Sequence, residues 1–217
     1  MKKTGKEDRF MKRKMKQLGI ALTFALCMLV SACSVQQKES DPCIIPVKPT
    51  EQENLIASAV EGRSSIFHFQ YSDEIKERKI YLEEWVQGKK TKTVLLLDGE
   101  TDKTEQMAVV TTLSQAEDKK WDGITYRLAV QQPELGTLIT PEPQTISFPT
   151  PLKAVAYSSL EEKESLQPNQ SYLILGGNFD IGNGVSPIAY GKMENPEQLP
   201  ASHSDYAITL RLETIGE

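Results

Sequence analysis

Apolar and polar residues alternate along much of this chain from residue 64 onwards. Successive side chains of a β-strand point to opposite faces of its sheet, so the alternation predicts half-buried strands. In the first half of the chain, turn residues separate expected strands at residues 66–71, 75–86, 93–97, 106–113 and 124–132. In the second of these, Ile80 and Leu82 should face one side, and Tyr81, Glu83 and Trp85 the other. Strands at this spacing predict an antiparallel meander over residues 64–132.

The strand expected at residues 93–97 differs from its neighbours because it is apolar on both faces, from Val94 to Leu97. This composition predicts a central position in a sheet. Asp98 and Gly99 follow directly, and such a pair favours a hairpin loop.

Prolines interrupt the middle of the chain, between residues 133 and 151. Short strands are expected there at residues 137–139 and 145–148. Because proline cannot donate a hydrogen bond to a sheet, these strands should lie at an edge or form a crossover between sheets. A domain boundary near 133–150 is the alternative, although neither half alone has enough strands for a closed sandwich.

Four further strands are expected in the last third, at residues 154–157, 172–175, 186–191 and 205–214, with a glycine-rich loop over 176–184. The last strand alternates cleanly. Its inward residues should be Tyr206, Ile208, Leu210 and Leu212, and its outward residues Thr209, Arg211 and Glu213. The pattern predicts a strand with one face in solvent.

The segment before the first strand is polar and rich in proline over residues 33–53. This composition is typical of a flexible tether. At its end, Thr50 and Glu53 have the spacing of a capping box and precede an apolar run, which predicts a short helix. An early strand is the alternative.

Together these elements predict an all-β protein in which residues 54–217 form an antiparallel β-sandwich. The spacing of Leu166, Pro168 and Tyr172 resembles the tyrosine corner of fibronectin type III-like sandwiches. That resemblance implies an immunoglobulin-like, fibronectin-like or related sandwich in which the Tyr172 hydroxyl caps the backbone upstream.

The first 32 residues combine a basic start with an apolar core from about residue 18 to residue 30. A basic lead, a short apolar core and small residues at a cleavage site are typical of a secretory signal peptide. The core is shorter than the roughly 20 residues that a transmembrane helix needs. An uncut membrane anchor is the alternative, and the start codon can be Met1 or Met11.

Leu29-Val30-Ser31-Ala32-Cys33 resembles the lipobox of bacterial lipoproteins. The resemblance implies a diacylglyceryl group on the Cys33 sulfur, cleavage after Ala32, and a lipid-anchored location on the extracytoplasmic face of the cell membrane. The whole chain is similar to small lipoproteins of Gram-positive bacteria. The residues that carry this likeness are the lipobox, Phe67-x-Phe69-x-Tyr71, Trp85 with Gly88-Lys89, and the closing strand from Tyr206.

Net charge and cysteine content limit the kinds of partner that the chain can bind. Removing the signal peptide takes away eight of the 25 basic and two of the 30 acidic residues, which leaves 17 − 28 = −11. Such a charge opposes binding to nucleic acid. With Cys27 in the signal peptide and Cys33 lipidated, Cys43 in the tether is expected to be a bystander, and an intermolecular disulfide through it is the alternative.

The sequence offers little catalytic chemistry. No nucleophile elbow, phosphate-binding loop or zinc-protease motif is present, and the histidines are His68 and His203 alone. The acidic residues of 98–102 and the loop 178–184 do not follow a calcium-binding pattern. We therefore expect no cofactor, no metal and no catalytic residue within 64–217.

Aromatic residues are the remaining candidates for a binding surface. Tyr81, Trp85 and Trp121 could stack on a ligand if they are exposed, but core packing is the favoured interpretation. The first functional hypothesis is a tethered, non-catalytic module that binds a protein, peptide or glycan outside the membrane. The second is a structural or accessory protein of the cell envelope that has no ligand of its own.

Overall fold

Strands make up most of the computed structural model, which describes residues 41–59, 62–115, 120–182, 185, 188–199 and 205–216. The elements in chain order are β1 (Cys43–Val47), α2 (Glu51–Ala59), β2 (Gly62–Gln70), β3 (Ile75–Val86), β4 (Lys89–Glu100), β5 (Thr104–Gln115), β6 (Trp121–Gln132), β7 (Thr137–Ile139), β8 (Gln144–Leu152), β9 (Ala154–Ser159), β10 (Glu164–Ser165), β11 (Ser171–Asp180), β12 (Gly191–Lys192) and β13 (Tyr206–Gly216).

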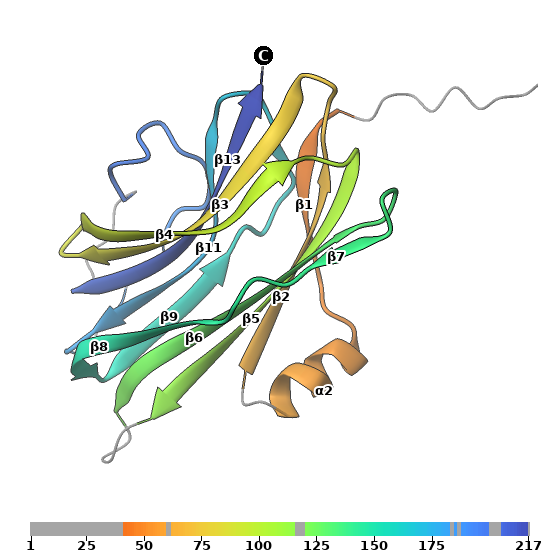
Figure 1. Ribbon diagram of the computed structural model, residues 1–217. Coiled ribbons are helices and arrows are strands. Elements are labelled where there is room, and N and C mark those ends of the chain that lie inside the picture. The colour runs from red at the N-terminus through yellow and green to blue at the C-terminus, as the bar shows by residue number, and fades with distance from the viewer. Residues whose placement is uncertain are drawn as a thin grey trace, which may run out of the picture. The chain divides into compact units, whose positions relative to one another are not determined.

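These strands form two antiparallel sheets that pack face to face (Figure 1). Sheet A has the order β10-β1-β2-β5-β6-β7, with β8 also paired to β6. Sheet B has the order β12-β11-β13-β3-β4, with β9 also paired to β11. One continuous core lies between the sheets and includes Phe67, Phe69, Ile80, Leu82, Val109, Ile124, Phe179, Ile208 and Leu210. The prediction of an all-β antiparallel sandwich is confirmed.

The expected meander over residues 64–132 is wrong, because β2 pairs with β5 in sheet A while β3 pairs with β4 in sheet B. The four strands instead form one long hairpin, bent where it crosses from sheet A to sheet B. Backbone hydrogen bonds join its two arms across the bend, from Tyr71 N–H to the Lys103 carbonyl and from Thr101 N–H to the Lys76 carbonyl. The tip lies at Gln87 and Gly88, whose φ angles of 49° and 75° are those a tight hairpin turn requires.

Strand β4 lies at the edge of sheet B, so the predicted central position of residues 93–97 is wrong. Leu95 is exposed and Val94 is half-buried. The strand also continues to Glu100, so Asp98 and Gly99 belong to β4 and not to a hairpin loop. A local apolar run therefore did not identify a central strand here.

The proline-rich middle of the chain forms the predicted crossover. Strands β7 and β8 lie at the edge of sheet A against β6, and β9 then joins sheet B against β11. Strand β11 continues to Asp180, through part of the predicted glycine-rich loop. A Cβ atom at Gly177 would lie 2.9 Å from the Tyr157 ring, so glycine allows β9 and β11 to pair closely. Of the strand expected at 186–191, residues 186 and 187 lie outside the described residues, and among the others only Gly191 is in a strand, the short β12.

The predicted tether is wrong from Cys43 onwards. Strand β1 pairs with β2 and β10, and Cys43 and Ile44 are fully buried. Burial of Cys43 opposes an intermolecular disulfide through it in the folded protein. Helix α2 follows, and its capping box is confirmed: Glu53 N–H donates to Thr50 Oγ1 at 3.2 Å, and Thr50 N–H donates to Glu53 Oε2 at 2.7 Å.

The hydrogen bond of the predicted corner at Leu166–Tyr172 is present. Gln167 N–H donates to the Tyr172 hydroxyl at 2.7 Å. The turn between them has Asn169 at a φ of 57°, a conformation that asparagine tolerates better than most residues. Gly216 N–H donates to the Asn169 side chain at 3.1 Å, so this turn also holds the end of β13.

We expect Tyr172→Phe to destabilise the fold, because the Gln167 amide loses its acceptor while the ring remains in place. The hydrogen bond is part-buried and Gln167 is exposed, so its loss should cost about 0.5–1.5 kcal/mol. For a domain of this size, each kcal/mol lowers the melting midpoint by roughly 2–4 °C. Thermal unfolding followed by circular dichroism measures the effect. A midpoint within a degree of the wild-type value would show that this hydrogen bond contributes nothing.

Candidate functional site

Trp85, one of the predicted ligand-facing aromatics, is completely buried on the outer face of sheet B. Its indole Nε1 donates to Thr209 Oγ1 at 2.9 Å. The residues 188–199 cover it through Ile188, Met193 and Leu199, which form a second apolar cluster with Leu173 and Ala207. A ligand therefore cannot stack on Trp85, and the favoured interpretation of this residue as core is correct.

The same covered face corrects the prediction for β13, whose outward residues were expected in solvent. Thr209 and Arg211 are buried. Arg211 Nε pairs with Glu83 Oε1 at 2.9 Å, and its Nη1 pairs with Glu213 Oε2 at 2.9 Å. Lys90 joins the network at 3.3 Å from Glu83 and 2.8 Å from Glu197, and the latter contact ties residues 188–199 to sheet B.

Tyr81 and Trp121 are half-buried. The Arg211 guanidinium lies 4.2 Å from the centre of the Tyr81 ring, so one ring face already has a cationic partner. Burial raises the pKa of the Tyr81 phenol, and the Glu213 carboxylate adds to this rise. Trp121 packs against the inter-sheet core at the start of β6. The three aromatics do not form one surface, since Trp121 belongs to sheet A and the others to sheet B.

The other singled-out residues offer no reactive cluster. His68 is exposed on β2. Asp102 is buried, and its carboxylate accepts hydrogen bonds from the backbone amides of Lys103 at 2.8 Å and Glu134 at 3.1 Å. Within the described residues, no group of three or more His, Cys, Asp or Glu side chains could hold a metal ion. The predicted signal peptide 1–32 with Ala32, as well as Cys33 and His203, lie outside the described residues.

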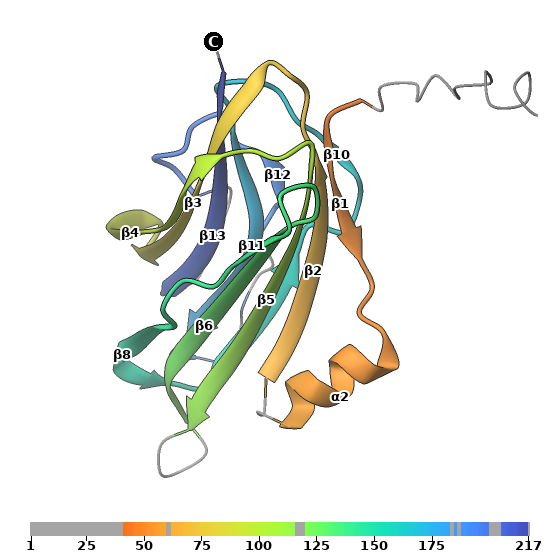
Figure 2. The ribbon, with the colours of Figure 1, turned by 45° about the vertical axis from the view of Figure 1, so that its right-hand side comes forward.

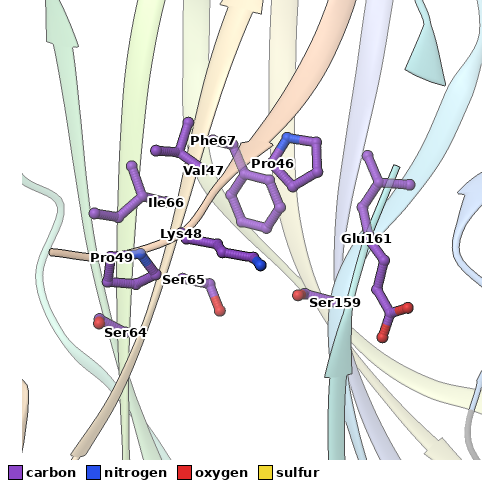
Figure 3. Close-up of a pocket in the computed structure, with 11 residues that line it drawn as sticks. Pro46, Val47, Lys48, Pro49, Ser64, Ser65, Ile66, Phe67, Ser159 and Glu161 are labelled. Atoms are coloured by element: carbon purple, nitrogen blue, oxygen red, sulfur yellow. The ribbon is translucent and has the colours of Figure 1, made fainter. Parts of the chain in front are cut away.

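A cleft that the sequence did not reveal opens at one edge of the sandwich (Figure 3). It has a volume of about 470 Å³ and is lined by residues 46–49, 64–67 and 159–161. We call it the edge cleft. The first two segments belong to the β1–β2 side, and the third belongs to the end of β9 and the residues after it. The cleft therefore lies between the edges of sheets A and B.

The walls of the edge cleft are apolar near the core and polar at the rim. Phe67 and Leu160 are buried, and the rings of Pro46 and Pro49 line the β1 side. Lys48 and Glu161 lie on opposite sides (Figure 3). Such a combination of apolar surface and a few polar groups is typical of a binding site.

One residue that lines the edge cleft has a hydroxyl without a hydrogen-bond partner. Ser64 Oγ is buried and makes no hydrogen bond within the described part of the chain. Ser64 and Ile66 point to the face of β2 opposite to Ser65 and Phe67 (Figure 3), so this hydroxyl does not face the cleft floor. Ser65 and Ser159 add two further hydroxyls from the two sides of the cleft.

Arg63 and Tyr157 form a contact next to the cleft-lining residues Ser64 and Ser159. The Arg63 guanidinium on β2 lies 5.6 Å from the centre of the Tyr157 ring on β9. Burial raises the pKa of the Tyr157 phenol, and the Arg63 charge acts in the opposite direction. Strand β10 pairs with β1 at Cys43 and Ile44.

Sequence reasoning missed this cleft because it assigned residues 46–49 to a tether. The available signal was Ile44-Ile45-Pro46-Val47, an apolar run within the polar segment. Proline at an edge strand is compatible with such a run, so the prolines alone did not exclude a strand.

Comparison with protein-family models, with curated proteins and with solved structures finds no match for this chain. The apolar run at residues 18–30 lies outside the described residues. Within the described part, no helix is long and apolar enough to span a membrane.

Proposed function

We propose that this chain is a lipid-anchored extracytoplasmic lipoprotein that acts as a non-catalytic binding module. The observation that carries the proposal is Leu29-Val30-Ser31-Ala32-Cys33 after a basic start and a short apolar core. Lipid on Cys33 would hold the sandwich at the membrane, since two acyl chains anchor a protein where one binds only reversibly.

The edge cleft supports a binding role over a purely structural one. It combines the buried Phe67 with the hydroxyls of Ser65 and Ser159 and two opposite charges, Lys48 and Glu161. A protein that only supports an envelope complex needs no such hollow. The acidic balance after Cys33 argues against nucleic acid as the partner and favours a protein, peptide or glycan.

We expect Cys33→Ala to abolish lipid attachment and to release the protein from the membrane fraction. Metabolic labelling with an alkyne analogue of palmitate, followed by fractionation of the cells, measures both effects. Cys27→Ala is the matched control, because Cys27 lies in the predicted signal peptide and should leave labelling unchanged. Equal labelling of the Cys33→Ala variant and the wild type would exclude the proposed anchor.

A further inference from the structure

We propose that the edge cleft binds an extended peptide segment, which adds as a strand to the free edge of β9. The inference rests on the proposed binding function and specifies the class of ligand. Edges of both sheets meet at the cleft, and an unpaired edge presents backbone donors and acceptors to another chain.

The edge of β9 that faces away from β11 is free. Among the described strands, β9 pairs with β11 alone. Leu160 N–H donates to the Ile174 carbonyl on β11 at 2.9 Å. Hydrogen-bonded pairs alternate along an antiparallel ladder, so Ala156 and Ser158 also direct their backbone groups to β11. The backbone groups of Val155, Tyr157 and Ser159 therefore point away from β11.

The opposite side of the cleft also has an incomplete ladder. Strand β1 pairs with β2 only from Ile66 to Gln70. Residues Gly62 to Ser65 pair with β5 on one side, and no described strand lies on their other side. The Arg63–Tyr157 contact shows that this part of β2 and β9 are close neighbours. Sheets A and B are thus separated here by a gap between two strand edges.

An extended peptide fits this gap better than a compact ligand does. On this side the cleft is lined by residues 159–161, at the end of β9 and just after it, and at a rise of about 3.3 Å per residue this is a length of roughly 10 Å, or about three peptide residues. Backbone hydrogen bonds to β9 would provide affinity, as in other cases of strand addition. Every second side chain would point toward Phe67, which favours an aliphatic residue at that position.

Hydrogen exchange of the chain from Ser34 tests the edge itself. This form contains the whole described unit, residues 41–217, which is compact by itself. The amides of Tyr157 and Ser159 should exchange at least tenfold faster than those of Ala156 and Ser158, which face β11.

The ligand class is tested with an mRNA-displayed library of random octapeptides. A selected peptide should bind in a saturable manner by isothermal titration calorimetry and slow exchange of the Tyr157 and Ser159 amides at least tenfold. Ser65→Trp, which fills the cleft, should weaken binding at least tenfold. Thr137→Trp is the matched control, because Thr137 is exposed on β7 at the far edge of sheet A.

Backbone methylation separates strand addition from binding by side chains alone. N-methylation of alternate amides of the selected peptide should reduce affinity at least tenfold, while the intervening positions tolerate it. The inference is overturned if the library yields no peptide that binds at the cleft. It is also overturned if N-methylation of the selected peptide leaves its affinity unchanged at every position. If a glycan then slowed exchange at the cleft, the binding function would stand and only the peptide class would fail. An unlipidated Cys33 would instead remove the proposed anchor and leave the peptide result intact.

Discussion

Replacing Glu105 with alanine is expected to lower the free energy of unfolding by about 3–5 kcal/mol, because it leaves the buried charge of Arg78 without a partner. Both side chains are about 1 % exposed, and Arg78 Nη2 lies 3.1 Å from Glu105 Oε1. At roughly 2–4 °C for each kcal/mol, the melting midpoint should fall by about 6–20 °C. Differential scanning calorimetry measures both quantities.

The size of this effect follows from the number of groups that depend on Glu105. Its carboxylate also accepts hydrogen bonds from the Tyr71 hydroxyl at 3.3 Å, the Gln132 amide at 2.9 Å and the Asp102 backbone at 3.3 Å. Burial and the Glu105 charge together raise the pKa of the Tyr71 phenol well above its usual range. This network lies where the long hairpin bends, and it connects β3 of sheet B with β5 and β6 of sheet A.

Two further variants test whether the loss of stability comes from the buried Arg78–Glu105 pair and not from the loss of any acidic residue. Glu134→Gln should be nearly neutral, because Glu134 is exposed. The double replacement of Arg78 by methionine and Glu105 by leucine should cost less than Glu105→Ala alone, since it removes both charges. A double variant as unstable as the sum of its two single variants would show that the pair is not energetically coupled.

The second large effect is expected for Trp85→Ala, which should destabilise the fold by about 3–5 kcal/mol. The substitution removes a fully buried side chain from the outer face of sheet B, together with its hydrogen bond to Thr209. Residues 188–199 pack over this position, so limited proteolysis should cut there faster than in the wild type.

Leu138→Ala provides the matched control for Trp85→Ala, because Leu138 is 66 % exposed and its truncation should change stability little. Denaturant unfolding followed by circular dichroism compares the variants without relying on tryptophan emission. A Trp85→Ala protein with wild-type stability would mean that Trp85 is accessible to solvent and available to a ligand after all.

Local sequence features predicted most of the long strands but missed β1, because a strand is recognised from alternation and flanking turn residues. Strand β3 has the predicted bounds, and Ile80 and Leu82 face the core as expected. The capping box at Thr50 was equally local. Pairing between strands was not predictable in this way, because the alternation of apolar and polar residues within a strand does not indicate which strand is its neighbour. The bent hairpin therefore replaced the expected meander.

The remaining errors concern polar residues that tertiary structure buries. Thr209 and Arg211 alternate like solvent-facing residues, but residues 188–199 return over them and Glu83 neutralises the arginine. Asp102 has the appearance of an ordinary turn residue, although it is buried and accepts two backbone hydrogen bonds. The edge cleft is lined by segments almost a hundred residues apart, so the apolar run at residues 44–47 could indicate a strand but not the cleft. Figure 2 shows this strand, β1, beside β2.

The most direct test of an extracytoplasmic module with an open edge cleft is thiol labelling of Ser65→Cys on intact cells. Cys33 is expected to carry lipid and Cys43 is buried, so a membrane-impermeant maleimide should report the new thiol alone. Thr137→Cys on the exposed β7 is the positive control for labelling, and Val109→Cys in the core is the negative control. The account predicts that Ser65→Cys is labelled on intact cells, as Thr137→Cys is. Labelling of Thr137→Cys without Ser65→Cys would contradict the open cleft, and labelling of both only after cell lysis would contradict the extracytoplasmic location.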